Sequence, residues 1–149
     1  MRNHLARSAM LAVVALAAFA PASSAATGSP VQITLDVNTT VGTETFTAIG
    51  AFCPSGTAES GNFRFAGGGQ GRGQGFTFHL EKTLTCDNGS GTLTIAVDAA
   101  THLGEPTDQG GWSVISGTRD WSGASGGGQI VGTYNSDGIV DVYTGIISS

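Results

Sequence analysis

Apolar and polar residues alternate along most of the chain after residue 30, which is the pattern of half-buried β-strands. In residues 31–37 every second residue is aliphatic and the residues between them are polar, and the same two-residue period returns in residues 76–80 and 93–97. Nothing after residue 26 shows a convincing helical period of 3.6 residues. The pattern therefore predicts an all-β protein.

Turn sequences separate the alternating segments. Asn88-Gly89 favours a hairpin turn with positive φ angles, and residues 54–56, 60–61 and 135–138 are rich in Gly, Ser, Pro, Asn and Asp. A loop is expected over residues 100–111. Seven or eight strands are expected, at residues 31–38, 43–53, 62–66, 76–86, 93–97, 112–116, 129–134 and 139–147.

So many short antiparallel strands must close into a barrel or stack as two sheets, because an open sheet would leave unpaired edges. Both tryptophans, Trp112 and Trp121, follow Cys86, so the Cys–Trp–Cys order of immunoglobulin domains is absent. We expect a single antiparallel eight-stranded β-barrel, with a β-sandwich as the alternative. A barrel of this size is either filled by side chains or just wide enough for one small ligand.

The N-terminal segment differs from the rest of the chain. Basic residues precede an apolar run at residues 10–20, and small residues follow it up to Ala26. This is the pattern of a secretory signal peptide, residues 1–26, which leaves one β-barrel domain at residues 27–149. The apolar run is too short to cross roughly 30 Å of hydrocarbon as a helix, so we expect a secreted protein with no permanent membrane anchor.

Charge narrows the choice of partners. Residues 1–26 contain two of the six basic residues and none of the eleven acidic ones, so the remainder has four basic and eleven acidic residues, a formal net charge of −7. A nucleic-acid partner is therefore not expected.

Two cysteines, Cys53 and Cys86, lie in the part predicted to be exported, where thiols pair. We expect one disulfide, closing a loop of 34 residues counted inclusively. A metal site would need further ligands and a catalytic thiol would need a histidine partner, and neither pattern is evident. No cofactor and no metal are predicted.

Other polar residues have weaker patterns. Lys82 interrupts an apolar strand face and is expected at a barrel mouth or with its amine reaching solvent. His79 and Glu81 share the opposite, outward face of that strand. A further polar group consists of His102, Glu105 and Asp108. The spacing of these three residues matches no known metal-ligand pattern, so we interpret them as part of a polar loop.

Four aromatic residues in the C-terminal half are the candidate ligand-binding residues, because they could together line one barrel mouth. The alternative is that they fill the core. They are Trp112, Trp121, Tyr134 and Tyr143.

The segment W-S-V-I-S-G-T-R-D-W-S-G-A-S-G at residues 112–126, followed by V-G-T-Y at 131–134 and D-V-Y-T-G at 141–145, resembles bacterial secreted proteins with an allene oxide cyclase-like or dirigent-like barrel. The resemblance implies a small barrel that holds hydrophobic or phenolic molecules and in some members steers a cyclisation. Arg119 stands where that family usually has glycine, although arginine resists positive φ. No catalytic residue is carried over.

Three functions follow from these observations. The favoured one is a secreted barrel that binds a small hydrophobic or phenolic molecule. The alternatives are a cyclase-like or dirigent-like enzyme that acts by confinement, and a structural or interaction module with a filled barrel. A cavity would separate the first two from the third.

Overall fold

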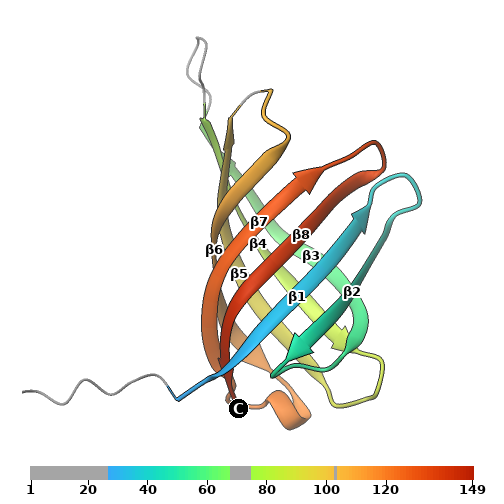
Figure 1. Ribbon diagram of the computed structural model, residues 1–149, viewed down its shortest axis with the longest axis vertical. Helices are drawn as coiled ribbons and strands as arrows, with labels where there is room; N and C mark the ends of the chain where they lie inside the picture. The colour runs from blue at the N-terminus through green and yellow to red at the C-terminus, as the bar shows by residue number, and fades with distance from the viewer. Residues whose placement is uncertain (1–26, 68–74, 103) are drawn as a thin grey trace, which may run out of the picture.

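A computed structural model describes residues 27–67, 75–102 and 104–149. The chain forms one closed antiparallel β-barrel in which each strand pairs with its neighbours in sequence and the last strand pairs with the first (Figure 1). The predicted eight-stranded barrel is confirmed, whereas the expected signal peptide, residues 1–26, lies outside the described residues. The strands are β1 (Ser29–Asn38), β2 (Thr43–Gly50), β3 (Ser55–Ala66), β4 (Gly75–Cys86), β5 (Thr92–His102), β6 (Thr107–Gly117), β7 (Ser125–Tyr134) and β8 (Gly138–Ser148).

The alternation in the sequence determines which side chains fill the barrel. Val31, Ile33 and Leu35 of β1 are buried, and the residues between them face outward, as a two-residue period requires. The same is true of Leu93, Ile95 and other inward residues of β5. Asp36, one of the polar residues between them, is exposed.

Two predictions of strand boundaries are wrong. Residues 100–111 were predicted as a loop, but residues 100–102 continue β5 and residues 107–111 begin β6. Residues 60–61 were predicted as a turn, but they lie inside β3, where a β-bulge between Gly61 and Arg64 bends the strand.

The barrel is weakest between β2 and β3. These strands share three residue pairs, at Thr45–Thr47, whereas every other pair of neighbouring strands shares at least seven. Beyond the paired segment the two strands separate, as Figure 1 shows. Side chains, described below, bridge this gap.

One end of the barrel is filled. The Cys53–Cys86 disulfide, predicted from the sequence, joins the segment after β2 to the end of β4. Phe52 packs between Phe46 and Trp121, with ring centroids 5.5 and 4.8 Å away. We call this region, with the β2–β3, β4–β5 and β6–β7 connections, the closed end.

A short 3₁₀ helix, η1 (Arg119–Trp121), lies at the closed end (Figure 1). Arg119 has a φ of 55°, so it adopts the left-handed conformation that residues other than glycine seldom take. Its guanidinium donates a hydrogen bond to the carbonyl of Gly89 at 3.2 Å, which ties η1 to the β4–β5 turn. In the described part of the chain, no helix is long and apolar enough to cross a membrane.

Candidate functional site

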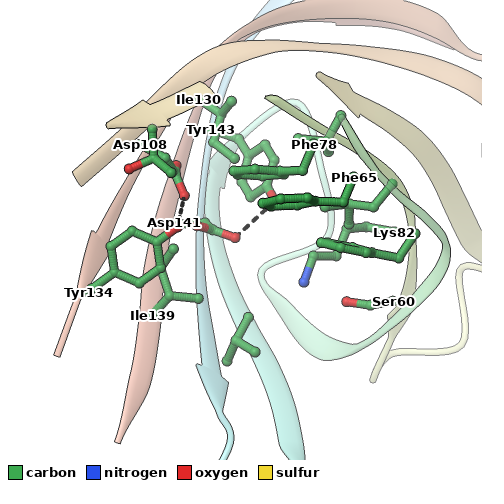
Figure 2. Close-up of a pocket in the computed structure, with 15 residues that line it drawn as sticks. Ser60, Phe65, Phe78, Lys82, Asp108, Ile130, Tyr134, Ile139, Asp141 and Tyr143 are labelled. Atoms are coloured by element: carbon green, nitrogen blue, oxygen red, sulfur yellow. Dashed lines mark hydrogen bonds between the residues drawn. The ribbon is translucent and has the colours of Figure 1, made fainter. Parts of the chain in front are cut away.

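A cavity of about 320 Å³ opens at the other end of the barrel, which we call the open end. It lies toward the turns that join β1 to β2 and β7 to β8. Most of its wall is apolar, and Figure 2 shows Phe65 and Phe78 on one side and Asp108 and Tyr134 on the other. The apolar lining residues are Val37, Phe63, Phe65, Phe78, Leu80, Val97, Ile130 and Ile139.

Aromatic rings surround the mouth of this cavity. Phe63 and Phe65 of β3 are 62% and 58% exposed, although both side chains line the cavity. Phe63 stacks on Phe78 with ring centroids 6.2 Å apart, and Phe65 packs against Phe76 at 5.2 Å. The rings therefore form an accessible apolar surface above the cavity.

Asp108 of β6 provides the first buried carboxylate. Its side chain is 2% exposed and accepts hydrogen bonds from the Gly132 amide at 3.0 Å and from the Tyr134 hydroxyl at 2.9 Å. Burial raises the pKa of Asp108 above its usual value, although the two hydrogen bonds oppose this shift. Burial and the neighbouring Asp108 raise the pKa of Tyr134 to about 12.

Asp141 of β8 provides the second buried carboxylate. Its Oδ2 accepts a hydrogen bond from the Tyr143 hydroxyl at 3.2 Å. The pKa of Asp141 is raised to about 6, mainly by burial. The charge of Lys82 opposes this shift, whereas the charges of Asp108 and Glu44 add to it. Burial and the Asp141 charge also raise the pKa of Tyr143 well above its usual value.

The second oxygen of Asp141, Oδ1, accepts no hydrogen bond from any residue that the structure describes. No side-chain polar atom in the same residues is both shielded from solvent and unpaired. Asp141 lines the cavity, and its unpaired Oδ1 therefore keeps some contact with solvent and can accept a further hydrogen bond.

Gly132 allows the two carboxylates to lie side by side. A Cβ at this position would come within 3.0 Å of both Asp108 Oδ1 and Asp141 Oδ1. Any side chain larger than hydrogen would push into this space. The glycine on β7 therefore makes room for carboxylates from β6 and β8, the two strands that flank it.

A third interior carboxylate, Glu44 of β2, is paired with a cation. Its Oε2 accepts a hydrogen bond from Lys82 Nζ at 2.8 Å, and its Oε1 accepts one from Ser60 Oγ at 2.7 Å. The side chains of Lys82 and Glu44 are only 5% and 19% exposed. These contacts bridge the gap between β2 and β3. Of the two positions expected for Lys82, it takes the one near a barrel mouth, in the wall of the open-end cavity, whereas its amine does not reach solvent.

The structure separates the four aromatic residues predicted from the sequence. Tyr134 and Tyr143 line the cavity and hydrogen bond to its carboxylates. Trp112 lies in the core, edge-on to Tyr143 at 6.4 Å, and its indole N–H donates to the Thr144 carbonyl at 3.3 Å. Trp121 packs at the closed end. A direct ligand contact thus stays a prediction for the two tyrosines.

The remaining polar residues that the sequence analysis considered lie outside the cavity, except Asp108, which lies in its wall. His79 pairs with Asp98 at 2.6 Å on the outer face, where the sequence pattern placed it. Asp108 was assigned to a loop with His102 and Glu105, but it points into the barrel from β6. Within the described ranges, no group of His, Cys, Asp or Glu is arranged to hold a metal ion.

Sequence reasoning missed Glu44, Asp108 and Asp141. The available signal was alternation: Asp141 is two residues from both Ile139 and Tyr143, so all three must share the inward face of β8. A charged residue at an inward position is the informative exception in such a strand.

Comparison with known proteins adds no relative. No protein-family model, no curated protein and no solved structure matches this chain.

Proposed function

We propose that this protein binds one small molecule in the cavity at the open end of the barrel. The observation that carries the proposal is a pair of adjacent buried carboxylates, Asp108 and Asp141, within an otherwise apolar, aromatic-rimmed cavity. Sites for small molecules typically combine an apolar wall with a few convergent polar groups. The ligand would have an apolar body and a hydrogen-bond donor.

The polarity of the interior supports this proposal over a barrel filled only for stability. Burying a carboxylate is costly, and apolar side chains of similar size would pack at no such cost. At the closed end the barrel uses apolar residues. The two carboxylates at the open end therefore call for a function that needs them.

The exposed rings support it further. Phe63 and Phe65 leave most of their surface in contact with water, although they lie above a cavity that could shelter a ligand. Covering them with an apolar molecule would remove this surface from water, at about 25 cal/mol per Å².

Extracellular location is part of the proposal. The Cys53–Cys86 disulfide is compatible with it, because disulfides persist in oxidising compartments. The ligand would then be one that the protein meets outside the cell.

Binding of an uncharged, environment-sensitive dye such as N-phenylnaphthylamine tests the proposal. We expect fluorescence enhancement with the wild-type protein and its loss in Ile139→Trp, which fills the cavity from β8. Val131→Trp is the matched control, because Val131 faces outward from the adjacent strand. Equal dye binding by both variants would contradict the proposal.

A cyclase-like or dirigent-like enzyme is the second candidate. The observation that favours it is the buried carboxylate of Asp141 in the wall of the cavity, whose pKa burial raises to about 6, as suits a group that exchanges a proton near neutral pH. If a substrate is found, Asp141→Asn should lose far more turnover than substrate affinity. Product formation that no interior polar substitution changes would refute the enzyme.

A further inference from the structure

We propose that the cavity selects an organic cation: a protonated amine attached to an apolar or aromatic body, with the ammonium group at Asp141 and Asp108. This inference rests on the proposed function and specifies the chemical class of its ligand. The sequence alone favoured a neutral hydrophobic or phenolic molecule, so the inference departs from that expectation.

The charges inside the barrel carry the argument. In the part of the chain that the structure describes, three carboxylates face the interior at this level, those of Glu44, Asp108 and Asp141, against one ammonium group, that of Lys82. Lys82 forms its ion pair with Glu44 at 2.8 Å. No ion pair to Asp108 or Asp141 is found among the described residues, which leaves both carboxylates without a cation of their own.

The hydrogen bonds of this pair show which ligand groups fit. The hydroxyls of Tyr134 and Tyr143 already donate to Asp108 and Asp141. Asp141 Oδ1 remains unpaired and can accept a further hydrogen bond, so a ligand must bring a donor. An ammonium group brings donors and a compensating charge together, and hydrogen bonds between charged partners are about twice as strong as neutral ones.

The raised pKa of Asp141 agrees with this reading. Burial destabilises its ionised form, and the charge of Lys82 and the Tyr143 hydrogen bond offset this cost only in part. With a pKa of about 6, the group is nonetheless ionised at neutral pH. A bound cation would stabilise this charge, whereas a ligand carboxylate would be repelled by both aspartates.

The rim offers the second half of the recognition. The faces of Phe65, Phe78 and Tyr134 lie around the same cavity as the carboxylates (Figure 2). Aromatic faces attract cations as well as apolar groups, and attraction strengthens when water is excluded. A volume of about 320 Å³ is near the lower limit of small-molecule pockets, roughly 300–1,000 Å³, so the ligand body is small.

The charge of the whole protein acts in the same direction. Residues 27–149 have eleven acidic and four basic residues. A net negative charge attracts cations toward the mouth and disfavours the approach of anions.

Three probes of one shape test the inference: phenethylamine, phenethyl alcohol and phenylacetate. Affinities are measured by calorimetry in phosphate buffer at about pH 8, because amine buffers would compete. We expect phenethylamine to bind about tenfold more tightly than phenethyl alcohol, and phenylacetate to bind most weakly.

Asp141→Asn is the decisive variant, because asparagine can still accept the Tyr143 hydrogen bond while lacking the charge. We expect phenethylamine affinity to fall about tenfold and phenethyl alcohol affinity to change less than about threefold. Asp98→Asn is the control, since it neutralises a carboxylate on the outer face. It should leave all three affinities unchanged.

Wild-type protein provides a second measurement that needs no variant to fold. Between about pH 8 and pH 5 Asp141 becomes protonated, so phenethylamine affinity should fall and phenethyl alcohol affinity should stay constant. The charged and titratable groups that face Asp141 are Glu44, Lys82, Asp108, Tyr134 and Tyr143, from β2, β4, β6, β7 and β8.

The outcomes separate the inference from the proposed function. Equal or tighter binding of phenethyl alcohol or phenylacetate would overturn the inference and leave a small-molecule barrel. Failure of all three probes and of the uncharged dye would instead overturn the proposed function.

Discussion

The closed and open ends of the barrel are built from the same alternating strands, but their inward side chains differ in chemistry. At the closed end Phe46, Phe52 and Leu93 fill the interior beside the disulfide, and Leu93 is 0% exposed. At the open end the inward positions of β6 and β8 hold Asp108 and Asp141 around a cavity. Apolar burial stabilises a fold, whereas buried carboxylates oppose it.

On the proposed function, this difference gives stability and binding to separate halves of one barrel. Substitutions at the closed end should then lower stability strongly with little effect on ligand affinity. Substitutions at the open end should impair ligand affinity and lower stability less.

Removing the disulfide should have one of the two largest effects on stability. Cys53→Ser combined with Cys86→Ser should lower the free energy of unfolding by about 3–4 kcal/mol, because the loop of the unfolded chain is no longer closed. Urea denaturation measures this change. Dye affinity below the unfolding transition should equal that of the wild-type protein, and a large loss of affinity would show that the two ends are coupled.

Shortening one leucine at each end compares the halves directly. Leu93→Ala at the closed end should cost about 3–5 kcal/mol, because it opens a void in a filled core. Leu80→Ala on the adjacent strand β4 should cost about 2–3 kcal/mol, since it enlarges a cavity that already exists. Urea denaturation gives both values. Equal costs would mean that the open end is packed as tightly as the closed end.

Asp141 should make the open end sensitive to pH. The folded-state pKa of about 6 lies above the ordinary value of 3.8, so the folded protein holds this proton more tightly than the unfolded chain. Stability should therefore fall as pH rises from about 4 to about 6, by up to about 3 kcal/mol.

Asp141→Asn isolates this contribution, because asparagine does not titrate. The variant should gain stability relative to the wild-type protein between about pH 4 and pH 8, as measured by urea denaturation at each pH. Parallel stability profiles for the two proteins would show that Asp141 titrates normally.

Much of the barrel was predictable because alternation is a local property. Its failures came from glycines. Residues 100–111 were expected to form a loop, but Gly110 lies in β6, where a Cβ would collide with the backbone of Asp98 on β5. This glycine permits two strands to approach each other closely. The sequence alone does not reveal whether a glycine forms a turn or allows such a close contact.

Much less of the site was predictable, because it depends on which strands meet across the barrel. The aromatic residues of the C-terminal half suggested one mouth, yet Trp121 and Tyr134 lie at opposite ends of β7. Asp108 and Asp141 are 33 positions apart in sequence and become neighbours only because β7 pairs with both β6 and β8. The alternation of apolar and polar residues does not show which residues of neighbouring strands pair with each other.

Truncating a ring at the mouth should have the smallest effect on stability and still impair binding. Phe65→Ala should change the free energy of unfolding by less than about 1 kcal/mol, because the ring is mostly exposed. Dye affinity should nevertheless fall several-fold, because the ring contributes apolar surface to the cavity. Val131→Ala removes a comparably exposed apolar side chain from the outer face and should leave dye affinity unchanged. If Phe65→Ala instead destabilised the protein as strongly as Leu93→Ala, the rim would be part of the core. Stability and binding would then not be separate at this residue.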